Sequence, residues 1–175
     1  TSTGNPLVSF MKFDPVTMAN ARYVVVRSSD GGNTFSTDAL ASSSSNPVCD
    51  CCPAAIVSSG SKAIMLYRDN ASNIRDTWAG VSNDGGMTFP GHMNADGHNW
   101  MFMSCPSSGP DGFITGDTIY SVFRNSASGT ALVYLSRSSI SGLSVGSSTP
   151  ITGVFSGLTS QDYPRIANDG NNAAA

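Results

Sequence analysis

The sequence predicts an all-β fold, a partial β-propeller of about three four-stranded blades. No stretch shows the 3.6-residue apolar period of an amphipathic helix, whereas short or alternating apolar runs recur about every dozen residues. Strand-like and turn-like segments also recur together at a period of about 55 residues, which suits one blade.

Composition favours a folded, exported protein. Hydrophobic residues make up 39% of the 175 residues, while charged residues make up only 12%. The formal charge of -3 arises without a basic stripe that could neutralise phosphates, so we expect no nucleic-acid partner. No apolar run reaches the roughly 20 residues of a membrane helix, so we expect no membrane insertion.

The first repeated landmark is a basic residue that closes an apolar strand. It occurs at Val8–Lys12, at Ile64–Arg68 and at Tyr120–Arg124. Equal spacing of these three segments predicts that Lys12, Arg68 and Arg124 occupy the same place in successive blades.

A proline opens each unit, and this is the second landmark. Proline suits a first strand position because it donates no ladder hydrogen bond. The three dipeptides are Cys52-Pro53, Cys105-Pro106 and Tyr163-Pro164. Together the landmarks predict a single propeller segment with blades at residues 1–48, 49–104 and 105–162, and the start of a further blade at 163–175.

The third landmark is a tight turn. Ser28–Phe35 and Ser82–Phe89 each follow an apolar strand and contain Asp-Gly-Gly. The Asp side chain can accept hydrogen bonds from turn amides, glycine adopts a positive φ without strain, and the closing Phe is expected to pack onto the blade. We expect a degenerate third copy near Ser136–Ser144.

Both turns match the Asp-box pattern Ser-x-Asp-x-Gly-x-Thr-Phe, and the chain resembles the sialidase-like (BNR-repeat) propeller superfamily. The stretch Cys49–Pro110 is also similar to secreted bacterial proteins of this type. The resemblance implies that the segment is part of a six-bladed propeller, which at this period requires about twice this length. It also implies a structural turn away from any catalytic face, so neither Asp is expected to act as an acid or a metal ligand. The matching residues are Ser28, Asp30, Gly32, Thr34 and Phe35, and then Ser82, Asp84, Gly86, Thr88 and Phe89.

Arg68 and Arg124 are the leading candidates for ligand binding, with Tyr67 and Asp69 beside the first of them. Equivalent strand ends converge around the axis of a propeller, and guanidinium groups meeting there would clamp a carboxylate. Sialidases, by resemblance, hold the carboxylate of sialic acid with three arginines.

Arg68 and Arg124 also have an interpretation without a ligand, and two observations weaken a sialidase site. The arginines could be inter-blade struts paired with Asp69, Asp76 or Asp117, and Lys12 in place of a third arginine weakens a three-arginine clamp. A retaining sialidase also needs a Tyr nucleophile activated by Glu, and the 175 residues contain no glutamate. Asp50 and Asp69 are candidates for an acid/base carboxylate, but a surface or turn role is favoured for both.

The cysteines predict disulfides, because their number is even and the chain is expected to be exported. One arrangement pairs Cys52 with Cys105 and Cys49 with Cys51, and another forms a vicinal Cys51–Cys52 bond. Ligation of zinc or copper by the same thiolates is chemically possible, but the spacing lacks paired Cys-x2-Cys knuckles.

Other polar and aromatic residues have two interpretations each. His92, Asp96 and His98 could bind a metal, although a solvent-exposed loop is favoured. Trp78 and Trp100 could stack on sugars, although core packing is simpler. No ordered Asp-x-Asp-x-Asp-Gly calcium loop is present, so we predict no metal site and no cofactor.

These observations favour a secreted or cell-surface module without a complete catalytic site, whose partners are glycans or protein subunits that cover its open blade edges. The alternative is an exo-sialidase or related glycoside hydrolase whose remaining catalytic residues lie outside this segment.

Overall fold

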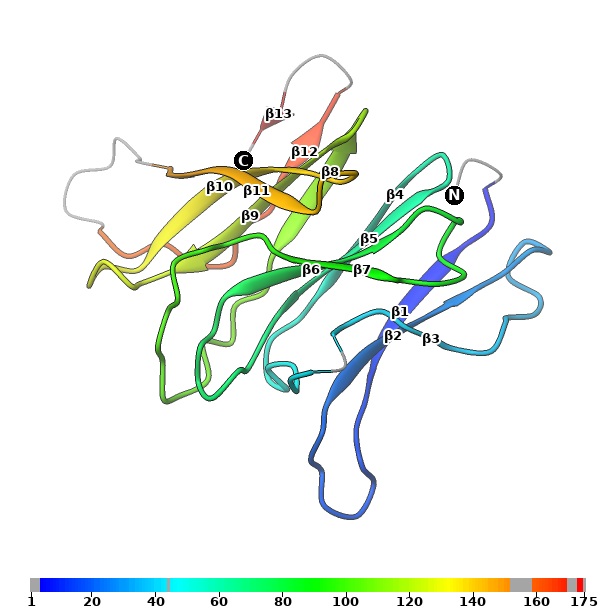
Figure 1. Ribbon diagram of the computed structural model, residues 1–175, viewed down its shortest axis with the longest axis horizontal. Helices are drawn as coiled ribbons and strands as arrows, with labels where there is room; N and C mark the ends of the chain where they lie inside the picture. The colour runs from blue at the N-terminus through cyan, green and yellow to red at the C-terminus, as the bar shows by residue number, and fades with distance from the viewer. Residues whose placement is uncertain (1–3, 44, 152–158, 170–172, 175) are drawn as a thin grey trace.

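The chain folds into antiparallel β-sheets that lie side by side (Figure 1). The computed structural model describes residues 4–43, 45–151, 159–169 and 173–174. The first sheet contains β1 (Leu7–Lys12), β2 (Arg22–Arg27) and β3 (Ala39–Leu40), and the second contains β4 (Ala55–Ser59), β5 (Lys62–Arg68), β6 (Thr77–Ser82) and β7 (Gly91–Asn94). The third contains β8 (Asp111–Thr115), β9 (Thr118–Asn125), β10 (Leu132–Ser139) and β11 (Ser144–Pro150), and β12 (Ala167–Asn168) pairs with β13 (Ala173–Ala174).

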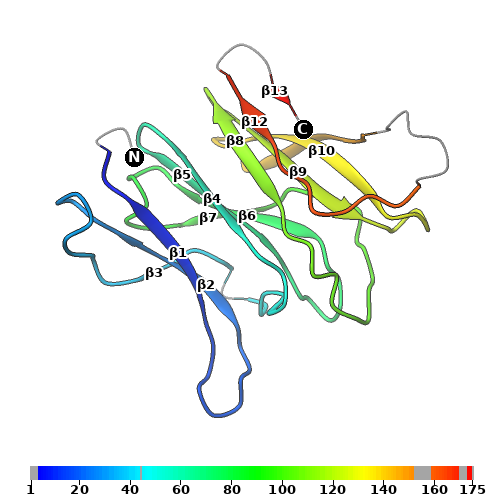
Figure 2. The same cartoon turned by 180° about the vertical axis from the view of Figure 1, so that it is seen from behind.

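The all-β prediction is confirmed, since the described residues contain strands and no helix. The sheets form an open row that does not close on itself, with the two ends visible in the reverse view (Figure 2). The prediction of four strands per unit is wrong for the first sheet, which has three strands among the described residues. Its first strand, β1, corresponds to the second strand of the next sheet, as the strand registers below show.

Local sequence explains the strands and their tight connections. β5 is apolar throughout its centre and buried on both faces because it lies in the middle sheet, whereas β1 alternates half-buried and exposed residues. Gly60 and Gly116 have φ of 60° in the two-residue turns that join β4 to β5 and β8 to β9. Such turns require positive φ, which glycine adopts without a Cβ clash.

Two hydrophobic clusters hold neighbouring sheets together. Between the first and second sheets, Tyr23 and Val25 pack with Met65 and Tyr67. The cluster between the second and third sheets includes Ile64, Leu66, Val81, Ile119 and Ile140. Alternate residues of β5 therefore face opposite neighbours, as the pleat of a strand requires.

The strand registers correct one equivalence in the predicted repeat. Leu7 pairs with Arg27 and Ile64 pairs with Val81, each directly before a Ser-x-Asp turn. Continuing along both ladders, Met11 rather than Lys12 occupies the place of Arg68. The spacing of basic residues along the sequence does not reveal this offset of one residue, because strand pairing sets the register.

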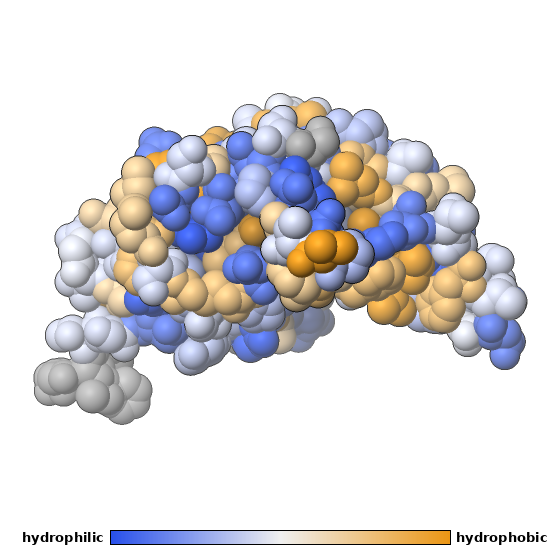
Figure 3. All heavy atoms as spheres, turned by 90° about the horizontal axis from the view of Figure 1, so that it is seen from below, coloured by the Kyte–Doolittle hydropathy of each residue, from blue (hydrophilic) through white to orange (hydrophobic). Residues whose placement is uncertain are grey.

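The first strands of successive sheets lie next to one another. β4 contacts β8, and β8 contacts β12, as both ribbon views show (Figures 1 and 2). The prolines predicted at first strand positions lie instead in the loops before these strands, with Pro53 preceding β4 and Pro106 preceding β8. The molecule seen from below has an arched outline, with hydrophobic and hydrophilic residues interspersed on its surface (Figure 3).

The predicted third turn differs from the other two. Between β10 and β11 no Asp stands in the chain; the Asp117 carboxylate, from the β8–β9 turn, accepts hydrogen bonds from the hydroxyls of Ser139 (3.1 Å) and Ser141 (2.6 Å). Lys62 of the second sheet donates to the same carboxylate at 2.9 Å. A carboxylate from a neighbouring hairpin thus organises this connection and links two sheets.

Candidate functional site

The first Asp turn is a closed network of short-range hydrogen bonds. Asp30 Oδ1 accepts from Ser28 Oγ at 2.8 Å and from the Thr34 amide at 2.9 Å, and Asp30 Oδ2 accepts from Thr34 Oγ1 at 2.7 Å. Ser28 Oγ accepts in turn from the Gly32 amide at 2.8 Å. The hydrogen bonds from Thr34 and Ser28 lower the pKa of Asp30 to about 2, so the carboxylate is ionised. Both of its oxygens already accept hydrogen bonds from the turn.

The second Asp turn repeats this network. Asp84 Oδ1 accepts from Ser82 Oγ at 2.7 Å, Asp84 Oδ2 accepts from Thr88 Oγ1 at 2.6 Å, and the Gly86 amide donates to Ser82 Oγ at 2.8 Å. Burial raises the pKa of Asp84, but hydrogen bonds from Thr88 and Ser82 outweigh it and hold this pKa at about 2. Turn donors surround both carboxylates, which suits a structural role better than acid catalysis or metal binding.

The aromatic residues that close the two turns behave differently. Phe89 is buried between the first and second sheets, as predicted for a residue that packs onto the fold. Phe35 is 46% exposed, so the same prediction is wrong for the first turn.

Arg68 lies at the end of β5 and is fully buried. Its Nε donates to the carbonyl oxygen of Ser108 at 3.1 Å, its Nη2 to that of Arg124 at 2.9 Å, and its Nη1 to that of Arg75. Burial lowers its pKa. This arrangement is the predicted strut, with backbone carbonyls in place of aspartates, and it leaves Arg68 without access to a ligand.

Trp100 contacts the side chains of two arginines, Arg68 from the second sheet and Arg124 from the third. The guanidinium carbons of Arg68 and Arg124 lie 5.1 and 5.3 Å from the centre of the Trp100 ring. Cation–π attraction of this kind is stronger where the groups are shielded from water. Trp100 is 2% exposed, so its ring packs in the interior and the sugar-platform interpretation is wrong for it.

The remaining members of the predicted ligand site are placed as follows. Tyr67 is fully buried and its hydroxyl accepts from the Ser43 amide at 2.9 Å. Burial raises the pKa of Asp69 to about 6; its Oδ2 accepts from Asn46 at 3.2 Å, and its buried Oδ1 has no hydrogen-bond partner. The side chain of Arg124 is 16% exposed and its Nε lies 3.6 Å from Asp162 Oδ2. The four residues thus line sheet ends in the interior rather than an open cleft.

A second buried carboxylate fixes the loop that carries Trp100. Asp76 Oδ1 accepts from the Trp100 amide at 2.8 Å, and Asp76 Oδ2 accepts from Asn99 at 3.0 Å and from Asn94 at 2.9 Å. The end of β7 and the loop after it are therefore held against the start of β6 by three hydrogen bonds to one carboxylate.

The histidine segment is not the exposed loop that composition favours. His92 lies within β7, and Asp96 is 2% exposed. The Asp96 carboxylate contacts His98 Nδ1 and accepts from Asn125 Nδ2 at 2.9 and 3.0 Å. Burial raises the pKa of Asp96. Asp96 thereby links the second sheet to the end of β9, as Arg68 does nearby.

The cysteines form one compact cluster, with a pairing different from that predicted. Cys51 and Cys105 form a disulfide with a Cα–Cα distance of 6.2 Å, whereas Cys49 and Cys52 are buried free thiols. The predicted Cys52–Cys105 and Cys49–Cys51 pairs and the vicinal Cys51–Cys52 bond are wrong for this structure. The disulfide joins the loop before β4 to the loop before β8, so it ties the second and third sheets at the end where Arg68 also links them.

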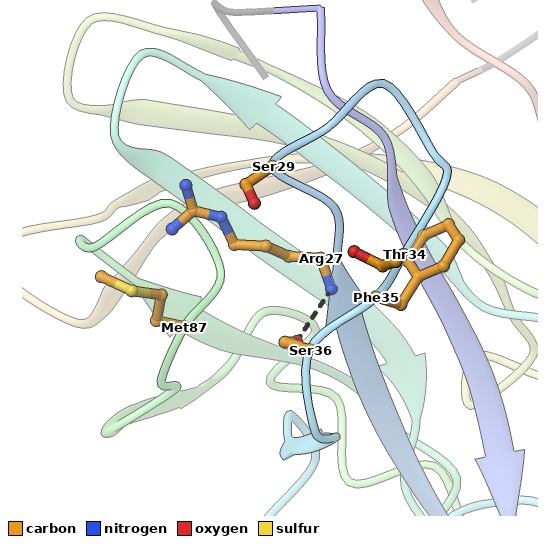
Figure 4. Close-up of a pocket in the computed structure, with 6 residues that line it drawn as sticks. All are labelled: Arg27, Ser29, Thr34, Phe35, Ser36 and Met87. Atoms are coloured by element: carbon orange, nitrogen blue, oxygen red, sulfur yellow. Dashed lines mark hydrogen bonds between the residues drawn. The ribbon is translucent and has the colours of Figure 1, made fainter.

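A shallow pocket of about 440 Å³ lies between the two Asp turns (Figure 4). Its lining includes Arg27, Phe35 and Met87, and Figure 4 shows the Arg27 side chain extending toward Met87. The Arg27 amide donates to Ser36 Oγ at 3.2 Å, which fixes the backbone at the pocket floor. The pocket combines a cation with an exposed aromatic ring.

Sequence reasoning missed this pocket, although one signal was available. Arg27 directly precedes the first Asp turn, where the second turn has Val81. A charged residue at a position that is apolar in the sister repeat marks a difference between the two turns that is not explained by strand packing.

No family model matches this chain, and no curated protein or solved structure matches it either. The described residues contain no helix long and apolar enough to cross a membrane. The structure defines the following class: an all-β protein of side-by-side antiparallel sheets that are linked at one end by a buried arginine, a buried tryptophan and an exposed disulfide.

Proposed function

We propose that the chain is part of an extracellular Asp-box β-propeller of the sialidase-like type, and that it serves as a non-catalytic module for assembly with further β-structure. The row of sheets, the contacts between first strands and the two equivalent Asp turns support propeller blades at residues 1–48, 49–104 and 105–162. The inter-sheet disulfide suits a secreted or cell-surface location.

One observation carries the assembly role: the outward face of the first sheet is apolar and exposed. Val8 and Phe10 on β1 are each 41% exposed, and Leu40 on β3 is 43% exposed. Phe10 pairs across the ladder with Val24, and Val24 pairs with Leu40, so these side chains share the face turned away from the second sheet. Contiguous apolar patches on a soluble protein mark interaction surfaces.

The equivalent face of the second sheet is covered by a neighbouring sheet. The register places Val8 and Phe10 where the second sheet has Met65 and Tyr67. Both of those residues are fully buried, because the first sheet packs over them. The equivalent face of the first sheet is therefore built to receive another β-sheet, whether from a longer chain or from a partner subunit.

Fewer observations support the two alternatives that involve a ligand, which are glycoside hydrolysis and glycan binding. A glycoside hydrolase needs a Tyr–Glu pair from outside these 175 residues, which contain no glutamate, and Arg68 is engaged as a strut. Glycan binding is favoured only by the pocket of Arg27 and Phe35, where a cation and an aromatic face could receive an acidic sugar.

The assembly proposal is tested with a double substitution, Val8→Asp with Phe10→Asp. The unmodified chain is expected to bind the dye ANS and to associate with rising concentration, because its outward face is apolar. Two carboxylates on that face should abolish association and lower dye fluorescence several-fold, since an unpaired charge is costly to bury. Sedimentation velocity and dye titration measure both effects.

The control is Val145→Asp, which adds one carboxylate to an exposed residue of β11 in the third sheet. It should leave association unchanged. A chain that stays monomeric at about 100 μM and fails to enhance ANS fluorescence contradicts the proposal, since weak interfaces form in this range.

A further inference from the structure

The four cysteine sulfurs form a cluster in which oxidised and reduced pairs are in contact. All four Sγ atoms lie within 4.8 Å of one another. Cys49 Sγ lies 2.9 Å from Cys52 Sγ and 3.4 Å from Cys51 Sγ, which is half of the Cys51–Cys105 disulfide. Cys49 and Cys52 are buried, whereas Cys51 and Cys105 are exposed. A buried thiol thus lies against one sulfur of an exposed disulfide.

The surroundings of Cys49 favour its thiolate form. The hydrogen bond from Cys52 lowers the pKa of Cys49 to about 7; burial opposes this shift, and the positive charges of Arg75 and Arg68 reinforce it. The same hydrogen bond and burial raise the pKa of Cys52. Among the described residues, neither the Arg68 nor the Arg75 guanidinium lies within ion-pair distance of a carboxylate, so neither charge is neutralised by a directly paired acid. Thiolates, not thiols, are the nucleophiles in disulfide exchange.

We propose that this cluster is an internal thiol–disulfide exchange site that makes Cys105 a surface modification site. The Cys49 thiolate attacks Cys51 Sγ, a Cys49–Cys51 bond forms, the Cys51–Cys105 bond breaks, and the electron pair leaves on Cys105 as a thiolate. One disulfide and one thiolate are present before and after, so the step needs no external oxidant or reductant.

The released Cys105 can then react with an external partner. A low-molecular-weight disulfide accepts attack by the Cys105 thiolate, which forms a mixed disulfide at Cys105 and releases one thiolate of the reagent. Exchange also replaces the covalent link between the second and third sheets with a local link inside the Cys49–Cys52 loop. This inference stands apart from the proposed assembly function, because it uses neither the outward face of the first sheet nor its partner.

The test is alkylation of the folded, unreduced chain with iodoacetamide at pH 8, followed by peptide mapping without reduction. In the unmodified chain, label is expected to accumulate on Cys105 while the peptide containing Cys49–Cys52 acquires an internal disulfide. Cys49→Ser removes the attacking thiolate and should slow labelling of Cys105 at least tenfold. Cys52→Ser keeps a hydroxyl donor for Cys49, so Cys105 should be labelled in this variant as fast as in the unmodified chain.

Three results would overturn the proposal. The first is an unmodified chain in which Cys105 stays unlabelled and the Cys51–Cys105 pair is the sole disulfide. The second is equal labelling of Cys105 in the unmodified chain and in Cys49→Ser. The third is a bound zinc or copper ion with no disulfide, seen by native mass spectrometry, which would make the cluster a tetrathiolate metal site. The internal disulfide in the unmodified chain is read independently of how well either variant folds.

Discussion

Arg68→Met is expected to lower the free energy of unfolding by about 3–5 kcal/mol, because it leaves buried carbonyl groups unpaired at about 1–3 kcal/mol each. Those carbonyls belong to Ser108, Arg75 and Arg124, and the side chain that serves them is fully buried. Methionine keeps much of the apolar length but supplies no donor. A loss of this size is a large share of the roughly 5–15 kcal/mol typical of a domain, so urea unfolding should show it clearly.

The control for this substitution is Arg137→Met. Arg137 is exposed and its guanidinium carbon lies 5.6 Å from the Tyr120 ring centre, so its removal should change stability by no more than about 1 kcal/mol. If Arg68→Met is as stable as the control, Arg68 is not a structural strut, and the carboxylate-clamp interpretation regains its basis.

Gly80→Ala is expected to destabilise the chain by at least about 3 kcal/mol. Gly80 lies in β6, where an added Cβ would overlap the carbonyl oxygen of Ala41, which directly follows β3 of the first sheet. Ala41 is fully buried, so the backbone that must move is confined by the core between the two sheets. The effect therefore measures how closely the first sheet packs on the second, and thermal unfolding followed by circular dichroism reads it.

Gly60→Ala provides the matched control, because a Cβ there has nothing within 4 Å. Its only penalty is the positive φ of 60°, which costs a non-glycine residue about 1–2 kcal/mol. Equal melting temperatures for the two variants would mean that the first sheet does not approach the second as described.

Sequence reasoning succeeded where the interactions are local. The donors and acceptors of the two Asp turns lie within four residues of Asp30 and Asp84, so the motif itself specifies their geometry. The strands were also accessible, because a short apolar run bounded by turn residues, such as residues 63–67, is typical of a buried inner strand.

It failed where long-range register decides the contacts. Arg68 finds its carbonyl partners 40 and 56 residues away, and no spacing rule distinguishes those from nearby aspartates. The choice of Cys51 rather than Cys52 as the partner of Cys105 depends on which side of a short loop each sulfur occupies. The register of β1 differs by one residue from the alignment of basic residues with β5. Because successive side chains of a strand point to opposite faces, Lys12 points to the face opposite to the one that Arg68 occupies in β5.

The most direct test of the account is amide hydrogen exchange in β1. β1 pairs with β2 along its full length, and its residues Val8 and Phe10 belong to the exposed apolar face of the first sheet. In the protein isolated from its native source, we expect the amides in the β1–β2 ladder to exchange at least tenfold more slowly than in the chain alone, because a further sheet packed on this face suppresses local opening of the ladder. Equally rapid exchange in both would show that nothing packs on the first sheet and would contradict the assembly proposal.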